Sequence, residues 1–260
     1  MPETRRNKHI RNDGKTRKAV CRFNDNYNLN ISNYDDYFLS TDDAFGKNFT
    51  TLKNWSKDHL RLINYWIPIQ IHIAEGLRHL HINFKHSGRL GAETIVVDIS
   101  GNVKIIDYGL NHNGLIYKPE QNSTAPEMDI VAGLKNGLHG AELLEDIFEK
   151  KVFLQTVDNL FYSWSMDGFL NSIDIQTDGD VDKFMKLYSR CSDIWSLGML
   201  LLTIYMDFIA DPVVSGSKFY RNNHRNQMKI FEGMLNPDPR KRFTVDMVLN
   251  ELYSMRMDCV

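Results

Sequence analysis

Residues 79–109 read HLHINFKHSGRLGAETIVVDISGNVKIIDYG, and the interpretation of the whole chain starts from this stretch. It holds two short runs of β-forming residues, Ile95–Val97 and Val103–Ile106, on either side of Ser100-Gly101-Asn102. A turn sequence between two such runs predicts a β-hairpin. A loop precedes the hairpin, and Asp107-Tyr108-Gly109 follows it.

A long helix is predicted immediately before this loop. Between Leu60 and His81 the apolar residues recur at intervals of three and four, which is typical of a helix that buries one face. They are Leu62, Ile63, Trp66, Ile69, Ile73, Leu77 and Leu80. Pro68 interrupts this pattern, so we expect the helix either to begin or to kink there.

Other elements are predicted from similar local patterns. They are a strand at Tyr37–Thr41, a helix at Phe49–Trp55, amphipathic helices around Leu143–Phe148 and Val157–Trp164, an acidic loop at Asn171–Lys183, and helices at Asp193–Ile204, Gln227–Leu235 and Val245–Tyr253. The acidic loop does not match a calcium-binding loop. Counted from Asp178, the sixth and twelfth positions are Lys183 and Ser189 instead of Gly and Glu.

Composition excludes several classes of function. The formal net charge is −2, which argues against a nucleic-acid partner. The three cysteines, Cys21, Cys191 and Cys259, share no close spacing, so neither a zinc site nor a disulfide framework is expected. An intracellular, reducing compartment, cytoplasm or nucleus, fits this pattern best. We expect no membrane-spanning segment, because we find no run of about 18 apolar residues.

The first 36 residues are polar, with eight Lys or Arg between Arg5 and Arg22. Such a stretch is usually a solvated tail. The alternative is an arm that directs the protein to the nucleus or to an anionic surface.

Motifs in a fixed order resemble the eukaryotic-type Ser/Thr protein kinase superfamily. Leu80-His81 resembles the end of the helix before the catalytic loop, and Ser87-Gly88-Arg89-Leu90 takes the place of His-Arg-Asp-Leu in that loop. Asp107-Tyr108-Gly109 takes the place of Asp-Phe-Gly, and Ala125-Pro126-Glu127 matches the Ala-Pro-Glu that ends the activation segment. Asp193–Gly198 resembles Asp-x-Trp-Ser-x-Gly, and Met234–Thr244 resembles the late Asp-Pro-x-x-Arg signature. The match through residues 79–109 has no gap.

This resemblance implies an α+β fold made mainly of the helical C-terminal lobe of a kinase, over residues 37–260, with an insertion at about 129–190. Residues 1–36 would be a basic tail or a remnant of the N-terminal lobe. The chain contains no Gly-x-Gly-x-x-Gly, and 36 residues are too few for that lobe, so nucleotide binding is doubtful. Truncated kinase-like chains of this kind resemble proteins of large DNA viruses.

The resemblance also implies a structural role for three retained residues. Asp193 would accept hydrogen bonds from the backbone of the catalytic loop. Glu127 and Arg242 would form a buried ion pair between the activation segment and the late helices.

At the catalytic positions the reacting residues are replaced. Arg89 stands where kinases hold the catalytic base, and arginine stays protonated at every relevant pH. Gly91 replaces the phosphate-contacting Lys, and Thr94 replaces the Asn that binds a second Mg²⁺. Asp107 is left as a vestigial metal ligand, and one carboxylate rarely holds Mg²⁺ alone.

The sequence thus predicts a pseudokinase, an inactive scaffold or regulator that binds a protein, either a true kinase or an assembly component. No cofactor is expected; Mg-ATP is the one candidate. Two alternatives stay open. One is a degenerate but active Ser/Thr kinase, which would need Glu93, Asp98 or Asp107 as its base. The other is a structural component of an assembly such as a virion.

Overall fold

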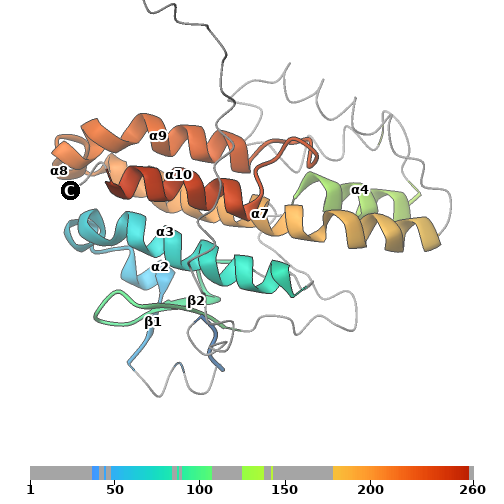
Figure 1. Cartoon of the computed structure of the whole chain (residues 1–260), viewed down its shortest axis with the longest axis horizontal. Helices are drawn as coiled ribbons and strands as arrows, with labels where there is room; N and C mark the ends of the chain where they lie inside the picture. Colours follow the sequence, from blue (N-terminus) through green and yellow to red (C-terminus); the bar gives the residue numbers. More distant parts are fainter. Residues whose placement is uncertain are drawn as a thin grey trace, which may run out of the picture. The chain divides into compact units, whose positions relative to one another are not determined.

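The computed structural model describes residues 37–40, 44, 48–83, 87, 90–106, 125–137, 142 and 178–257, and these combine helices with a small sheet (Figure 1). The predicted α+β class is therefore confirmed. Predictions that concern the N-terminal tail and the amphipathic helices at 143–148 and 157–164 lie outside the described residues, as do those for Arg89 and Asp107.

The predicted hairpin is present. β2 (Ile95–Val97) pairs antiparallel with β3 (Val103–Ile105), and β1 (Thr50–Thr51) pairs with the other edge of β2, so the strand order is β1-β2-β3. In the turn Gly101 has a φ of +85°, a conformation that side chains disfavour. A Cβ there would also lie 2.5 Å from Cδ1 of Tyr65.

Two predictions beside the sheet are only partly correct. The residues predicted as a strand at Tyr37–Thr41 make one parallel bridge, between Phe38 and Ile105, and Thr41 is outside the described residues. The helix predicted at Phe49–Trp55 begins only at Leu52 (α2, Leu52–Trp55). Thr51 ends the strand β1 and caps α2, because its side chain accepts a hydrogen bond from the backbone N–H of Asn54.

The long helix is α3 (His59–Ile82), which begins after the capping residue Asp58. Pro68 lies inside α3, so of the two predicted alternatives the one in which the helix begins at Pro68 is wrong. Proline removes one helical hydrogen bond. Its neighbours Ile67 and Ile69 are buried, and their packing offsets this loss.

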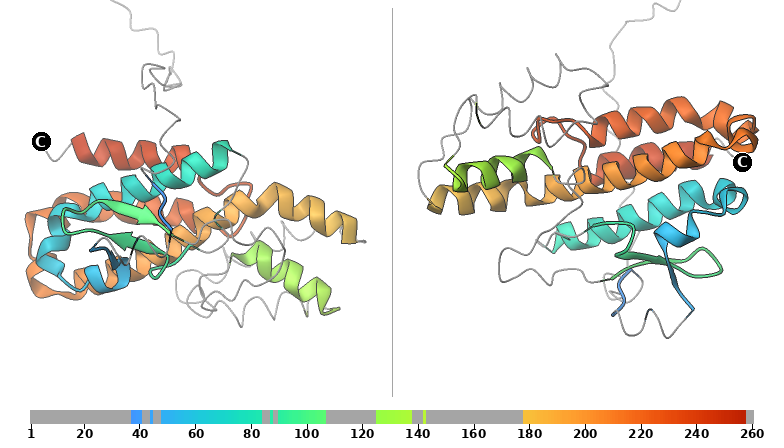
Figure 2. Two further views of the ribbon diagram at one scale, coloured as in Figure 1. Left: turned by 90° about the horizontal axis from the view of Figure 1, so that it is seen from below. Right: turned by 180° about the vertical axis from the view of Figure 1, so that it is seen from behind.

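Four helices lie side by side: α3, α7 (Asp178–Ala210), α9 (Lys218–Met234) and α10 (Val245–Met257). The sheet packs against α3 on the side away from α9 (Figures 1 and 2). α4 (Pro126–Lys135) runs along the N-terminal part of α7, and α8 (Pro212–Ser215) connects α7 to α9.

The core between α3, α7 and α9 combines aromatic rings with a buried amide pair. Trp66 stacks on Tyr205 with ring centroids 5.7 Å apart. Gln70 and Gln227 are fully buried and exchange hydrogen bonds of 3.0 and 2.9 Å, and Nε1 of Trp66 donates to Oε1 of Gln227 at 3.1 Å. Because buried amides are costly when unpaired, this pair defines the register of α9 against α3.

Two helices begin well before the predicted position. α7 begins at Asp178, so the prediction of an acidic loop is wrong from Asp178 to Lys183. Acidic residues are favourable at a helix start, where the helix dipole is positive. α9 begins at Lys218 instead of Gln227, because Ser217 caps it by accepting a hydrogen bond from the N–H of Tyr220 at 3.2 Å.

One segment of α7, Leu187–Ala210, is apolar and long enough to cross a membrane by length and composition alone, which the sequence analysis did not anticipate. In the structure 67% of its most apolar window is buried inside the protein. Most of its apolar side chains therefore pack in the core of the protein, around Ile194, Leu197 and Leu201.

Gly198 allows a test of how α7 packs on the end of α9. A Cβ at Gly198 would lie 2.9 Å from Cβ of Met234 and 3.0 Å from Cδ2 of Leu235. Helix propensity favours alanine by about 1 kcal/mol, but overpacking a core costs about 1–3 kcal/mol. We expect Gly198→Ala to lower the free energy of unfolding, measured in urea, by about 1 kcal/mol. Gly91→Ala is the control, since a Cβ there meets nothing within 4 Å. A more stable Gly198→Ala variant would contradict this packing.

Candidate functional site

The Asp193 carboxylate joins three segments of the fold. One of its oxygens accepts a hydrogen bond from the backbone N–H of Ser87 at 2.7 Å and lies 3.1 Å from Nε2 of His81 at the end of α3. Asp193 itself is in the interior of α7 and is buried. The predicted hydrogen bond from the loop backbone to Asp193 is therefore confirmed, at Ser87.

The loop that begins at Ser87 is anchored a second time at Leu90, which is buried in the core. The hydroxyl of Ser87 is also buried and has no hydrogen-bond partner among the described residues. Arg89 lies between these two anchors in the sequence and is outside the described residues, as is Asp107. The structure therefore brings Gly91 and Thr94 together and describes neither Arg89 nor Asp107.

Thr94 closes a tight turn with Gly91. The Thr94 hydroxyl accepts a hydrogen bond from the N–H of Gly91 at 2.9 Å and donates one to the Gly91 carbonyl at 3.1 Å. The backbone N–H of Thr94 donates to the same carbonyl at 3.1 Å. At the position where the resemblance expects a metal-binding amide, this hydroxyl is thus engaged in holding a turn.

Two carboxylates considered as alternative bases are engaged in other contacts. Asp98 accepts hydrogen bonds from the N–H groups of Ser100 and Asn102, at 2.8 and 2.9 Å, and from the Asn102 side chain at 2.8 Å. Burial alone would raise the pKa of Asp98, but these hydrogen bonds outweigh it and lower the pKa. Glu93 forms an exposed ion pair with Lys53 at 2.9 Å. A lowered pKa makes a carboxylate a weaker base at neutral pH.

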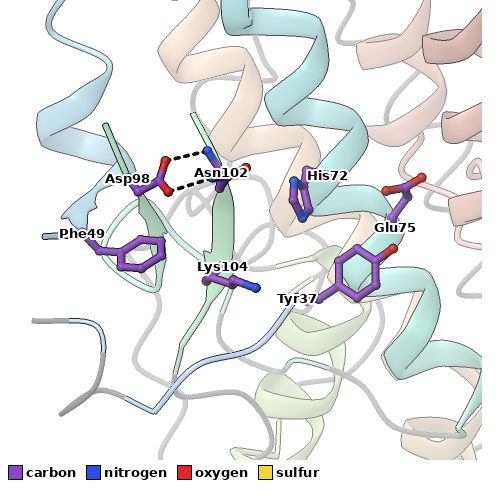
Figure 3. A pocket seen from close by; sticks show the side chains of 7 residues that line it. All are labelled: Tyr37, Phe49, His72, Glu75, Asp98, Asn102 and Lys104. Carbon is purple, nitrogen blue, oxygen red and sulfur yellow. Dashed lines mark hydrogen bonds between the residues drawn. The ribbon is translucent and has the colours of Figure 1, made fainter. Parts of the chain in front are cut away.

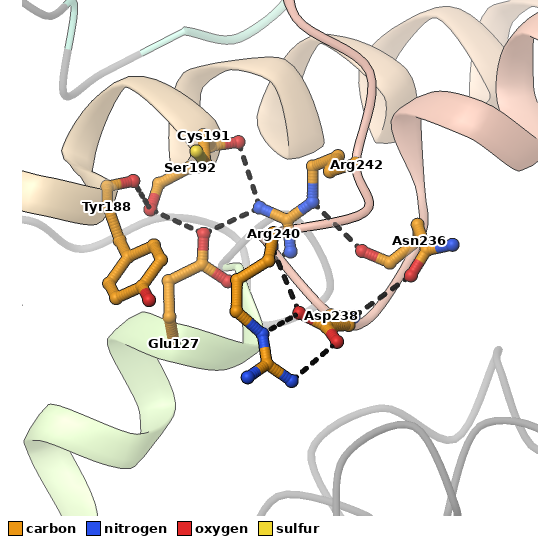
Figure 4. A network of polar contacts seen from close by, with 8 residues as sticks. All are labelled: Glu127, Tyr188, Cys191, Ser192, Asn236, Asp238, Arg240 and Arg242. Atoms are coloured by element: carbon orange, nitrogen blue, oxygen red, sulfur yellow. Dashed lines mark hydrogen bonds and ion pairs between the residues drawn. The ribbon is translucent and has the colours of Figure 1, made fainter. Parts of the chain in front are cut away.

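The predicted ion pair between Glu127 and Arg242 is confirmed (Figure 4). Two nitrogens of the guanidinium bind the two carboxylate oxygens at 2.5 and 2.9 Å. Both side chains are fully buried. The contact joins the first turn of α4 to the segment before α10.

Neighbouring groups use the remaining hydrogen-bonding capacity of this pair. The hydroxyl of Ser192 donates to Glu127 at 2.8 Å. Arg242 donates to the backbone carbonyls of Cys191 and Asn236 at 2.8 and 2.9 Å, and its guanidinium carbon lies 5.0 Å from the centroid of the Trp195 ring. One network therefore fastens α4, α7 and the 236–242 segment (Figure 4).

Asp238 closes the turn in that segment. It accepts hydrogen bonds from the N–H, Nε and Nη2 groups of Arg240 at 3.0, 2.9 and 2.8 Å. Burial alone would raise the pKa of Asp238, but the hydrogen bonds and charge of Arg240, together with the charge of Lys241, lower it. Asp238 is thus an ionised structural group.

A pocket of about 430 Å³ lies between α3 and the hairpin (Figure 3). Its lining residues are Tyr37, Phe49, His72, Glu75, Asp98, Asn102 and Lys104. Glu75 also accepts a hydrogen bond from the hydroxyl of Tyr253. Sequence reasoning did not select this pocket. The available signal was that His72 and Glu75 are polar and one helical turn apart, outside the apolar stripe of α3.

No metal centre is formed by the described residues, among which no three His, Cys, Asp or Glu side chains come together. Cys191 is a free thiol, and burial raises its pKa. Cys21 and Cys259 are outside the described residues.

Comparison with known proteins adds no relative: no protein-family model matches the chain, and no curated protein matches it.

The buried pair can be tested with a double-mutant cycle of Glu127→Leu and Arg242→Met. Each single variant leaves a buried charge without its partner, so we expect each to lose about 3–5 kcal/mol of unfolding free energy in urea. The double variant should lose less than the sum, because no unpaired charge remains. The control is Lys229→Met, which breaks the exposed pair with Glu251 and should cost less than about 1 kcal/mol. An equally small cost for Arg242→Met would refute the buried network.

Asp238 predicts a pH dependence of stability. Its pKa is lower in the folded protein than the usual value of 3.8. Its stabilising effect is therefore present above that value and is lost as the pH falls through the lower, folded pKa. Asp238→Asn should be less stable than the wild type from pH 7 to about pH 5, and the difference should shrink below about pH 4. Urea unfolding at a series of pH values measures this. A difference independent of pH would contradict it.

Proposed function

We propose that this chain is a catalytically inactive protein-kinase-like scaffold or regulator that acts by binding a protein. The observation that carries the proposal is the residue set at the catalytic-loop positions. Arg89, Gly91 and Thr94 stand where kinases hold the base, the phosphate-contacting Lys and the Mg²⁺-binding Asn. A guanidinium cannot accept the proton of a substrate hydroxyl.

The kinase-like fold is supported by contacts between distant motifs. The resemblance expects Asp193 to bind the loop backbone, and it expects an ion pair between Glu127 and Arg242. Both contacts are made, across sequence separations of 106 and 115 residues, so local sequence patterns cannot account for them. One feature departs from the expectation: the helix that contains Asp193 begins at Asp178 instead of at Asp193.

The proposed loss of catalysis is supported by the hydrogen bonds and ion pairs that the polar groups near the loop already make. The Thr94 hydroxyl holds its turn with Gly91, Asp98 binds the hairpin turn, and Glu93 pairs with Lys53. As a replacement base, Asp98 or Glu93 would have to give up its contact before it could approach a substrate.

The described part of the loop does not fit Mg-ATP. Gly91 offers no cation to a phosphate, and the Thr94 hydroxyl is buried in its turn. Asp107 alone would have to hold the metal, and Mg²⁺ is usually bound by carboxylates together with substrate phosphates. The proposal therefore includes no phosphoryl-transfer step.

Binding remains as the function because the residues that build the fold are kept. The contacts of Asp193, Glu127 and Arg242 hold the loop, α4 and the 236–242 segment in one arrangement. A rigid surface of this kind suits a protein partner, either a true kinase or an assembly component, in a reducing compartment.

The first test is a thermal-shift titration with ATP, with and without Mg²⁺ or Mn²⁺. A ligand at about 100 times its dissociation constant adds about 2.7 kcal/mol of stability, which raises the melting temperature by a few degrees. We expect no shift at millimolar nucleotide, and no phosphate transfer to a generic protein substrate. An active Ser/Thr kinase measured in parallel is the positive control.

A metal-dependent shift that Asp107→Ala abolishes would overturn the proposal in favour of a functioning nucleotide cleft. Phosphate transfer that the same variant abolishes would point to the degenerate active kinase.

A further inference from the structure

The exposed face of α9 carries a row of cations. Lys218, Arg221, Arg225 and Lys229 are all exposed, and they follow one another at intervals of three, four and four residues. Glu232, which is also exposed, follows Lys229 by three residues and ends the row. Residues at these intervals lie on the same face of a helix. With a rise of 1.5 Å per residue, the row is about 16 Å long, with about 4.5–6 Å between successive cations along the axis.

The opposite face of α9 holds the helix in place. Asn223, Gln227, Ile230, Phe231 and Met234 are buried. Gln227 makes the amide pair with Gln70 of α3. α9 packs on α7 and α10 (Figure 1). The four residues of the cationic row are exposed. The row is thus a preorganised surface on a fixed helix.

Most of this charge is not neutralised within the described protein. Lys229 pairs with Glu251 at 2.8 Å. Lys218, Arg221 and Arg225 form no ion pair with any described residue. The first turn of α9 contains no acidic residue, although a helix N-terminus is itself partly positive. Like charges four residues apart also destabilise a helix. An acidic partner would relieve all of these unfavourable interactions.

We propose that this face of α9 binds an acidic helix of a partner protein, through carboxylates spaced like the cations. The inference rests on the proposed protein-binding function and names the chemistry of the partner. Asn222 and Asn226 are exposed beside Arg221 and Arg225, and their amides can donate to and accept from the polar side chains of such a helix.

Two other anionic partners fit less well. A nucleic acid is disfavoured because the chain has a net charge of −2. The aromatic residues of α9 are also partly or fully buried, and the ring of Tyr220 is already stacked on His224 at 4.5 Å, so they offer bases a poor stacking platform. A membrane surface is disfavoured because the apolar residues of α9, such as Ile230 and Phe231, are buried in the core and cannot insert.

The test measures binding of a fluorescent, Glu-rich helical peptide to the full chain by anisotropy. The test variant is Arg221→Glu/Arg225→Glu, and the control is Lys57→Glu/Lys183→Glu, which changes net charge equally at exposed lysines outside α9. Both pairs are on the surface, and Arg221, the fourth residue of α9, lies where the helix dipole favours glutamate. We therefore expect both double variants to melt at the temperature of the wild type, which would show that a loss of binding is not caused by a loss of folding.

We expect the control to bind like the wild type and the test variant to bind about tenfold more weakly or not at all. Binding of the wild type should also be lost near 1 M salt, where the Debye length is about 3 Å. No binding of the peptide to the wild type at low salt, or equal binding by both double variants, would overturn the proposal.

The same anisotropy assay with a DNA duplex, and sedimentation with phosphatidylserine vesicles, test the other partners. Tighter binding of either, abolished in the Arg221→Glu/Arg225→Glu variant, would overturn the acidic-helix proposal and reassign the face. A concentration-dependent dimer that the same variant dissociates would reassign it to a second copy of this chain. None of these results depends on nucleotide binding, so a failure here is distinct from a failure of the proposed inactive function.

Discussion

The buried ion pair of Glu127 and Arg242 is the constraint on which the arrangement of the C-terminal helices depends. A charge removed from water is tolerated only when it is paired and its hydrogen-bonding groups are satisfied. Arg242 meets this condition by binding Glu127 of α4, the Cys191 carbonyl of α7 and the Asn236 carbonyl before α10. Displacing α4 would leave the buried charge of Arg242 without its partner, and displacing α7 would leave part of its guanidinium without a hydrogen bond.

Two further polar contacts join α3 to α9 and to α7. Gln70 and Gln227 join α3 to α9, and His81 and Asp193 join α3 to α7. Apolar packing in the same core is not directional, so it allows helices to slide or rotate at modest cost. Hydrogen-bonded pairs do not allow this movement, because a small shift leaves buried polar atoms unsatisfied. The polar contacts therefore select one packing among those that the apolar residues permit.

The contacts that hold the fold involve different residues from those on which the proposed inactivity rests. The contacts use Asp193, Glu127 and Arg242, whereas the kinase resemblance assigns the groups of phosphoryl transfer to the positions of Arg89, Gly91 and Thr94. The two sets do not overlap, so the second can change without affecting the first. Thr94 also makes a structural contact, since its hydroxyl closes the turn with Gly91.

The sequence by itself determined the elements whose signals are local. The turn around Gly101 and the apolar period of α3 predicted the hairpin and the long helix, and the ordered motifs predicted the pairing of Glu127 with Arg242. Only the tertiary structure decided where α7 and α9 begin, which residues line the pocket beside His72, and that Gln70 and Gln227 meet. The reason is physical. Periodicity reports the face that a helix buries, whereas polar first turns carry no such period and are stabilised by their caps and charges, and buried amides are stabilised by partners elsewhere in the chain.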